Sequence, residues 1–346
     1  MHATMAVIGL GMVSPVGRTA MQTCAALRAG ISQFEELDGI VDQFGEPVIA
    51  SRIGDVTNAP HVMVSAAIHA SVEAIAPVER VELSRRSLSV SVLVKENRPF
   101  GRQFDAAEFG VFLLSQLGLP QSTAIYPYDR GNAAGMDALF YAQERLARNP
   151  DSLELIVGFD SLRDFATLAR LETMNRLKSP SQGRGLIPGE AAAAVLLQNS
   201  EASSYLPAFC VIEGIGCATE PVPVGSEDPC LGEGLTAAIS SALEMAGWAS
   251  GDVEKVYCDL NGEVYRAHEW MLALCRTLTN PKVVHPADCI GDVGAAFSPL
   301  LIGMAAVALH RGYARANRAL VFCSSELGTR GSVCLSKPLK GTRSWK

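Results

Sequence analysis

The sequence has no cysteine pair that is spaced for a metal site. Its nine cysteines include no Cys-x-x-Cys pair, their number is odd, and no histidine stands at metal-ligand spacing from them. Most of them lie among apolar residues, where cysteine behaves as a small hydrophobic side chain. We therefore expect no metal and no cofactor, in a reduced and cytoplasmic protein.

An excess of positive charge is also missing. The chain has 29 Lys and Arg against 36 Asp and Glu, which gives a net charge of −7. A basic surface is what attracts polyanions, so this balance argues against nucleic acid or an anionic membrane surface as the main partner.

We expect neither a secretion signal nor a membrane-spanning segment. The first residues, 1–9, lack a basic start and predict an opening β-strand. The longest apolar stretch, 293–309, is rich in Gly and Ala and contains Ser298 and Pro299. It is too short to cross a bilayer, so we expect a buried core helix and no membrane span.

The chain of 346 residues, 48% of them hydrophobic, is long enough for a large core. Short apolar runs bounded by Gly or Pro predict ten strands, at 6–10, 88–94, 123–126, 153–158, 192–197, 209–215, 255–260, 282–284, 319–323 and 332–335. Amphipathic or apolar segments between them predict helices at 20–28, 64–76, 106–117, 136–147, 235–246, 264–277 and 299–310. Strands that alternate with helices predict an α/β fold.

The two series of strands resemble each other. A run of small residues at 131–135 leads into one helix, and a similar run at 294–298 leads into another. We interpret this as an internal duplication with pseudo-two-fold symmetry, in halves 1–200 and 205–340 joined near 198–207. Two unrelated α/β domains remain the alternative. The stretch 220–234, with three prolines and three glycines, predicts a surface loop.

Five segments, in order, resemble the β-ketoacyl-acyl-carrier-protein synthases of the thiolase superfamily. These are AVIGLGMVSPVG (6–17), GNAAGMDAL (131–139), VGFDSL (157–162), GLIPGEAAAAV (185–195) and GDVGAA (291–296). The resemblance implies a thiolase-like fold, in which two pseudo-symmetric βαβαβαββ halves form five layers, αβαβα.

The residues that carry the family's chemistry are replaced. Condensation needs a cysteine to hold the acyl chain and two histidines, or histidine and asparagine, to stabilise the enolate oxygen. The cysteine position falls on Asn132, and the first histidine position falls on Asp259. The second histidine position falls on Gly291, or on Asp292 if one residue is deleted. The family's lysine falls on 286 or 287. An amide is not a nucleophile at neutral pH, so we expect no condensing activity.

Other residues offer two further hypotheses. Cys289 lies near His285, Asp288 and Asp292, which is a conceivable shifted Cys–His–Asp set, although a structural role for them is the simpler interpretation. Alternatively, Asn132, Asp259 and Asp292 share one polar pocket. The pocket candidates are then Arg130, Gly131, His285, Cys289, Gly291 and Arg330. Two buried carboxylates raise each other's pKa unless a cation, Arg130 or Arg330, compensates.

The resemblance leaves three functions open. The first is a non-catalytic partner, like a chain length factor, that forms a heterodimer with an active ketosynthase, or a homodimer, in fatty acid or polyketide biosynthesis. The second is an active acyl-thioester enzyme, such as a malonyl-carrier-protein decarboxylase or an atypical acyltransferase. The third is a scaffold or ligand-binding protein unrelated to acyl metabolism. A possible basic patch for an acyl carrier protein comprises Arg85, Arg86, Arg163, Arg170, Arg176, Lys178 and Arg184.

Overall fold

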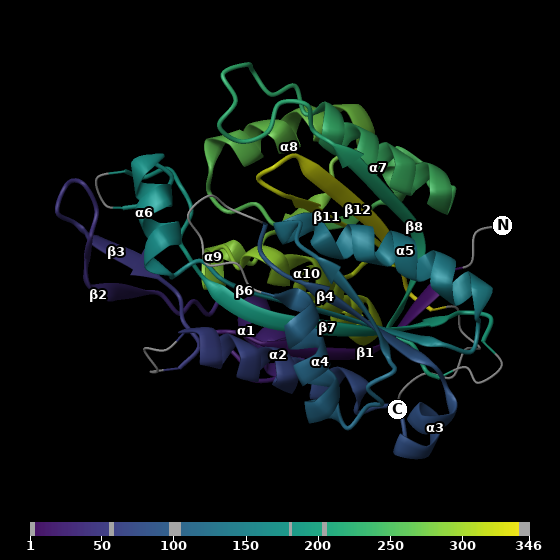
Figure 1. Cartoon of the computed structure of the whole chain (residues 1–346). Coiled ribbons are helices and arrows are strands. Elements are labelled where there is room, and N and C mark those ends of the chain that lie inside the picture. Colours follow the sequence, from purple (N-terminus) through teal and green to yellow (C-terminus); the bar gives the residue numbers. More distant parts are fainter. Residues whose placement is uncertain (1–3, 55–58, 97–104, 180–181, 203–205, 339–346) are drawn as a thin grey trace.

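The computed structural model describes residues 4–54, 59–96, 105–179, 182–202 and 206–338, and its main feature is a ten-stranded mixed sheet (Figure 1). All ten predicted strands are present in it, with ends that differ by a few residues. A separate two-stranded sheet projects from one side of the molecule (Figure 1).

The large sheet consists of two halves with the same strand order. The first half has the order β5-β4-β6-β7-β1 and the second has β10-β9-β11-β12-β8, so each reads third, second, fourth, fifth and first along the chain. In each half the fifth strand is antiparallel to its two neighbours, and the remaining pairs are parallel. The strands are β1 (Met5–Val13), β4 (Leu88–Leu93), β5 (Ala124–Tyr128), β6 (Leu153–Ser161), β7 (Glu190–Asn199), β8 (Cys210–Thr219), β9 (Lys255–Cys258), β10 (Lys282–Val284), β11 (Arg318–Ser324) and β12 (Thr329–Ser336).

The halves meet where Met5–Val7 of β1 pairs with Cys210–Ile212 of β8. The common strand order and pairing confirm the pseudo-symmetry of the two halves. The exact boundary between 200 and 205 stays a prediction, because residues 203–205 lie outside the described residues.

Helices divide the molecule into five layers (Figure 1). Helices α5 (Ala134–Arg148) and α10 (Phe297–Arg311) lie between the two halves of the sheet and share one core cluster with strands of both. Helices α2 (Ala59–Ile75) and α4 (Ala106–Leu117) cover the outer face of the first half. Helices α7 (Glu233–Ala246) and α8 (Val264–Thr277) cover the outer face of the second. Helix α1 (Ala20–Arg28) packs beside α10.

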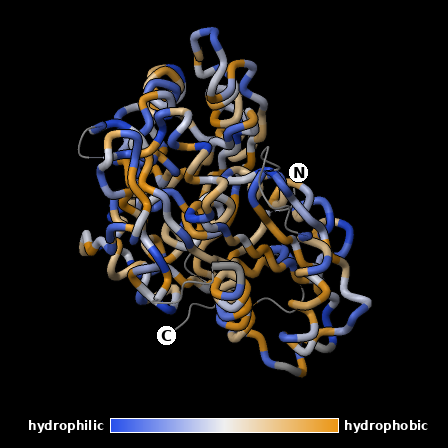
Figure 2. The backbone as a smooth tube through the Cα atoms, turned by 60° about the vertical axis from the view of Figure 1, so that its left-hand side comes forward, coloured by the Kyte–Doolittle hydropathy of each residue, from blue (hydrophilic) through white to orange (hydrophobic). Residues whose placement is uncertain are grey.

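Helix α10 is the most buried helix of the core. Its residues from Phe297 to Leu309 are all buried, and it ends at Gly312, whose φ of 76° is the left-handed conformation that glycine adopts without strain. Residues 294–311 are long and apolar enough to cross a membrane by composition alone, but 89% of them are buried inside the protein. The expectation of a core helix is confirmed. Figure 2 shows apolar segments running through the interior, with hydrophilic stretches in many of the outer loops.

Several elements had no sequence prediction. Strands β2 (Glu35–Val41) and β3 (Pro47–Ala50) form the projecting hairpin, and α6 (Phe165–Thr173) packs on it through a small leucine-rich cluster. Two short helices, α3 (Arg80–Arg85) and α9 (Ala287–Ile290), were also not predicted. The predicted surface loop 220–234 is only partly exposed, because Glu220 and Cys230 are buried.

Candidate functional site

Two matching turns face each other at the centre of the molecule. The 3-10 turns η1 (Gly131–Ala133) and η3 (Gly294–Ala296) precede α5 and α10. Each begins at a glycine in the left-handed conformation, with φ of 60° at Gly131 and 52° at Gly294. The hydroxyl of Ser298, in the first turn of α10, donates to the carbonyl of Asn132 in η1, which links the two segments. The runs of small residues at 131–135 and 294–298 therefore start buried helices, as the sequence predicted.

Asn132 occupies the middle of the first turn. Its side chain is buried, and its Nδ2 donates to Oδ2 of Asp259 at 3.1 Å. Asp259 stands in the loop directly after β9. The structure thus brings together Asn132 and Asp259, which the sequence resemblance predicted at the cysteine and first histidine positions, and joins them as an amide and a carboxylate.

Asp259 is held by a cation that the sequence analysis missed. Nη1 of Arg266, in the first turn of α8, lies 2.8 Å from Oδ2 of Asp259, and the backbone N–H of Ser324 donates to the same oxygen at 2.9 Å. Burial raises the pKa of Asp259, while Arg266 and the Ser324 N–H act in the opposite direction. Burial alone lowers the pKa of Arg266, but the carboxylates around it raise it overall, so Arg266 stays charged.

Asp292 belongs to the same network through Asn261. It is buried, and it accepts hydrogen bonds from Nδ2 of Asn261 at 2.7 Å and from the backbone N–H of Gly294 at 2.9 Å. Asp292 is also one of the groups that raise the pKa of Asp259. The three residues of the sequence hypothesis, Asn132, Asp259 and Asp292, therefore lie in one buried polar network.

The network continues outward as ion pairs between the two halves. Arg176 makes a bidentate pair with Glu263, at 2.6 and 3.0 Å, and a further pair with Glu326 at 2.9 Å. Nε of Arg266 lies 3.5 Å from Glu263, and Arg170 pairs with Glu326 at 2.9 Å. A signal for part of this set exists in the sequence: Glu263 and Arg266 are three residues apart at the start of a predicted helix, on one face.

The structure places the two suggested compensating arginines elsewhere. Arg130 is largely exposed and pairs with Asp137 at 3.4 Å. Arg330 is fully buried on β12, where it pairs with Glu269 at 2.6 Å. The proposal that Arg130 or Arg330 neutralises the two aspartates is therefore wrong. Arg266 does so instead, because α8 starts beside the loop that carries Asp259.

The shifted Cys–His–Asp set gains no support from the geometry. Nδ1 of His285 lies 3.0 Å from Asp288, but the Asp288 side chain is mostly exposed. Cys289 is half-buried on α9, and burial together with Asp288 raises the pKa of its thiol, which disfavours the thiolate. Gly291 has a φ of 71° and lies against the carbonyl of Ile187, so its role is to let two backbones approach.

The turn between β11 and β12 covers η1. Ser325 contacts Arg130 and Ala133: its Oγ lies 2.5 Å from the carbonyl of Arg130 and accepts from the N–H of Ala133 at 2.8 Å. The buried carboxylate of Glu96 accepts from the backbone N–H groups of Glu326 and Leu327 at 3.0 and 3.1 Å. The residues around Asn132 are thus covered by a turn that both halves hold.

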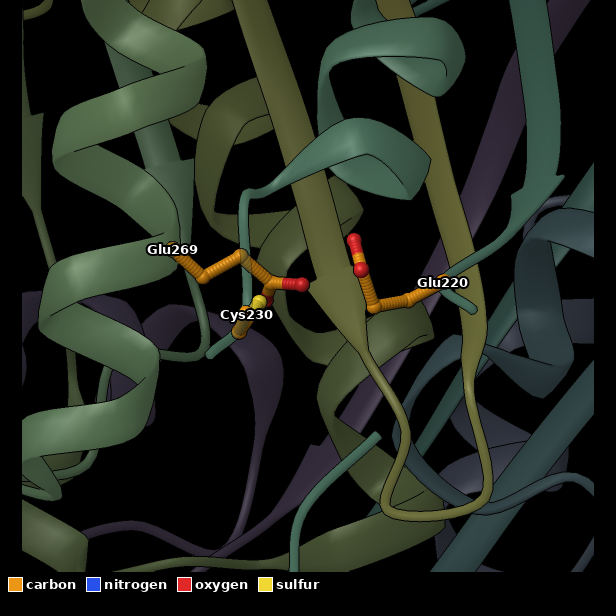
Figure 3. A group of neighbouring side chains, drawn as sticks. All are labelled: Glu220, Cys230 and Glu269. Carbon is orange, nitrogen blue, oxygen red and sulfur yellow. The ribbon is translucent and has the colours of Figure 1, made fainter. Parts of the chain in front are cut away.

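A second buried group contains the donor types that bind metals. The ligand atoms of Glu220, Cys230 and Glu269 lie within 4.8 Å of one another (Figure 3). These groups already have protein partners, since Glu269 pairs with Arg330 and Glu220 accepts from the N–H of Gly234 at 2.8 Å. Burial also raises the pKa of Cys230, so the thiol form is favoured. The donor set fits an internal polar cluster better than a metal centre.

Most of the suggested basic patch is used inside the protein. Arg163 pairs with Glu190 at 3.1 Å, and Arg86 donates to backbone carbonyls. Together with Arg170 and Arg176, which belong to the network above, these cations are not available to a partner. Lys178, Arg184 and Arg85 are the exposed members of the set.

A surface cleft of about 560 Å³ borders this network at Arg176 and Glu263. Three segments line it: the residues after α6, the loop between β8 and α7, and the start of α8. The lining residues are Met174, Asn175, Arg176, Gln182, Gly183, Arg184, Gly185, Val224, Gly225, Glu263, Val264 and Tyr265.

The comparisons with known proteins agree with this architecture. No protein-family model and no curated protein sequence matches the chain. Among solved structures, it resembles a chain of the AntDE:AntF complex, a type II polyketide ketosynthase with its acyl-carrier protein, with a TM-score of 0.82 at 14% identity, over 98% of this chain and 100% of that one. The ishigamide ketosynthase/chain length factor gives a TM-score of 0.82 at 16% identity, over 98% and 100%. A β-ketoacyl synthase from Burkholderia phymatum gives 0.79 at 16% identity, over 97% and 100%.

These likenesses, over the full length of the solved chains, define the fold. The chain has the thiolase-like fold of the ketosynthases and chain length factors, as the five sequence segments predicted.

Proposed function

We propose that the chain is a non-catalytic ketosynthase-like subunit that pairs with an active ketosynthase in acyl-carrier-protein-linked fatty acid or polyketide biosynthesis. The observation that carries this proposal is the hydrogen bond between Asn132 and Asp259. A nucleophile at the start of α5 would need a deprotonated thiol, and this position instead holds an amide whose donor is directed at a carboxylate.

The surroundings of Asn132 favour a structural role over altered chemistry. An oxyanion is stabilised by donors that are free to point at it. Here the Arg266 guanidinium is bound to Asp259, and the Asn261 amide donates to Glu263 and Asp292. Stabilisation of an enolate by this set would require these ion pairs to break first.

The structural neighbours include complexes between ketosynthases and chain length factors. One is a ketosynthase with its chain length factor from Xenorhabdus doucetiae, with a TM-score of 0.75 at 13% identity, over 97% of this chain and 98% of that one. A paired arrangement of two chains with this fold is thus a natural one for a subunit without a nucleophile.

Strand β5 offers the surface for pairing. It is the edge of the first half-sheet, and its free side can add a strand from a partner. Exposed Phe140 and Tyr141 on α5 lie beside it, and the ring of Tyr141 is 6.4 Å from that of Tyr128. Pro127 removes one donor from this edge, so apolar contacts from these aromatic residues must supply much of the affinity.

The test is to purify the chain alone and together with a ketosynthase encoded beside it, and to measure both samples by native mass spectrometry. We expect a one-to-one complex that Tyr141→Glu weakens at least about ten-fold, as for a hot-spot aromatic residue. The control is Met271→Glu, which places the same charge at an exposed apolar residue of α8. A chain that remains monomeric beside every ketosynthase offered contradicts the pairing.

Catalysis is tested separately with malonyl-loaded acyl carrier protein. We expect the thioester to stay intact after incubation with the purified chain, as followed by mass spectrometry. Conversion to the acetyl thioester by the wild type, but not by Asp259→Asn, identifies a decarboxylase instead and refutes the non-catalytic role.

A further inference from the structure

The lining of the surface cleft includes a buried ion pair. Its two buried charged residues, Arg176 and Glu263, bind each other through two hydrogen bonds. Behind Glu263 lies Arg266, then Asp259, and only then Asn132. A ligand in the cleft therefore meets a row of paired charges before the position where the family holds its acyl chain.

The lining of the cleft combines polar groups that already have protein partners with exposed cationic and apolar side chains. The hydroxyl of Tyr265 is already occupied, since it donates to the carbonyl of Val222 at 2.6 Å and accepts from Arg330 at 3.1 Å. Exposed Arg184 is a cation of the mouth, and Met174 and Val264, both partly exposed, offer apolar surface beside it. After the Arg176–Glu263 pair cancels, the lining carries one positive charge in a protein with a net charge of −7.

We propose that this cleft binds a small amphipathic anion, with its apolar part against Met174, Val224 and Val264 and its charged group at Arg184, and that it ends at the Arg176–Glu263 pair. A volume of this size is typical of small-molecule sites, which combine apolar walls with a few placed polar groups. The inference rests on the proposed function in one respect. In a non-catalytic subunit the ligand is bound without reacting, because it does not reach Asn132.

The experiment uses octanoate as the probe, with octylammonium and acetate as comparisons, each titrated into the purified full chain by isothermal titration calorimetry. We expect saturable binding of octanoate, and no measurable binding of octylammonium, which keeps the tail and reverses the charge, or of acetate, which keeps the charge and lacks the tail. Equal affinity for octanoate and octylammonium overturns the proposal.

Matched variants locate the site. Arg184→Gln should weaken octanoate binding about 5-fold, the upper range for an exposed ion pair, whereas Arg85→Gln, an exposed arginine on distant α3, should leave it unchanged. Met174→Ala should weaken it about 3-fold or more through lost apolar contact, and Met271→Ala should not. Equal effects within each pair place octanoate elsewhere and refute the site.

A crystal structure of the octanoate complex tests where the cleft ends. We expect the octanoate tail to stop at Arg176 and Glu263. A tail that passes these residues and reaches Asn132 refutes the proposed end of the cleft. Failure to bind octanoate leaves the ketosynthase pairing intact, since that is measured without any ligand, so the two proposals fail independently.

Discussion

Arg266 is the residue whose removal tests the central network most directly. Arg266→Met keeps the length of the side chain and removes its charge, which leaves Asp259 without its cation in a site that is almost fully buried. Breaking a buried ion pair by removing one partner costs about 3–5 kcal/mol. Asp259 keeps the Ser324 N–H and Glu263 keeps Arg176, so we expect a loss of about 3 kcal/mol, at the lower end.

The assay is equilibrium urea unfolding followed by circular dichroism and by fluorescence, with coincident transitions as the check on two-state behaviour. The control is Arg148→Met, which removes an exposed pair with Glu144 and should cost less than about 0.5 kcal/mol. A loss for Arg266→Met within about 0.5 kcal/mol of this control refutes the role of Arg266 as the cation of the site.

The same variant has a predicted pH dependence. The pKa of Asp259 is raised in the folded protein, so the folded state holds this proton at pH values where the unfolded chain has lost it. The stability that this group contributes is therefore present at low pH and falls as the pH rises through the folded pKa. Removal of Arg266 raises that pKa further, so the deficit of Arg266→Met should be larger at pH 8 than at pH 5. A deficit that grows towards pH 5 contradicts this.

Three further predictions concern the neighbouring residues. Asn132→Cys should not gain condensing activity with acyl- and malonyl-loaded carrier protein, because the nearby carboxylate of Asp259 raises the pKa of a new thiol; rapid acylation of the variant, seen by mass spectrometry, argues against this. Arg330→Met should destabilise the chain by about 3–5 kcal/mol in the urea assay, because it leaves a buried glutamate unpaired, and an unchanged midpoint contradicts it. Gly131→Ala should lower the stability more than Gly118→Ala. Both glycines are left-handed, with φ of 60° and 66°, so each alanine adds about 1–2 kcal/mol of backbone strain, but only the Cβ at 131 would meet a side chain, that of Glu96, at 2.9 Å. Equal thermal shifts for the two alanine variants refute the added steric cost.

The strands and central helices were predictable because their signal is local. Each buried strand is a short apolar run between glycines or prolines, and α10 is an apolar helix with small residues at its start. The β2–β3 hairpin was missed because Glu35–Val41, EELDGIV, has neither a run of apolar residues nor a regular alternation, and the strand is mostly exposed. Its stability comes from packing on α6, a contact between distant segments that no local pattern contains.

The site was predictable in its positions and not in its partners. The positions of Asn132, Asp259 and Asp292 follow from segment order, because Asn132 and Asp292 lie at the turns before α5 and α10 and Asp259 directly follows β9. Which arginine neutralises the aspartates depends on side-chain direction: Arg330 of β12 pairs with Glu269 of α8, and Arg266 pairs with Asp259 in the loop after β9. Asp259 also shows where the network is incomplete, since its Oδ1 has no hydrogen-bond partner among the described residues.

The glycine and alanine pattern at the start of α5 has a reason to exist without a nucleophile. A Cβ at Gly135 would collide with the side chain of Ser298 on α10, and a Cβ at Gly294 would collide with the carboxylate of Asp160. These contacts hold the two central helices and their turns together, whatever residue stands at 132. Retention of the pattern is therefore evidence for the packing of the two halves, whereas activity depends on the side chains that the turns present. In this chain Asn132 binds Asp259, which pairs with Arg266, and Asp292 accepts from Asn261.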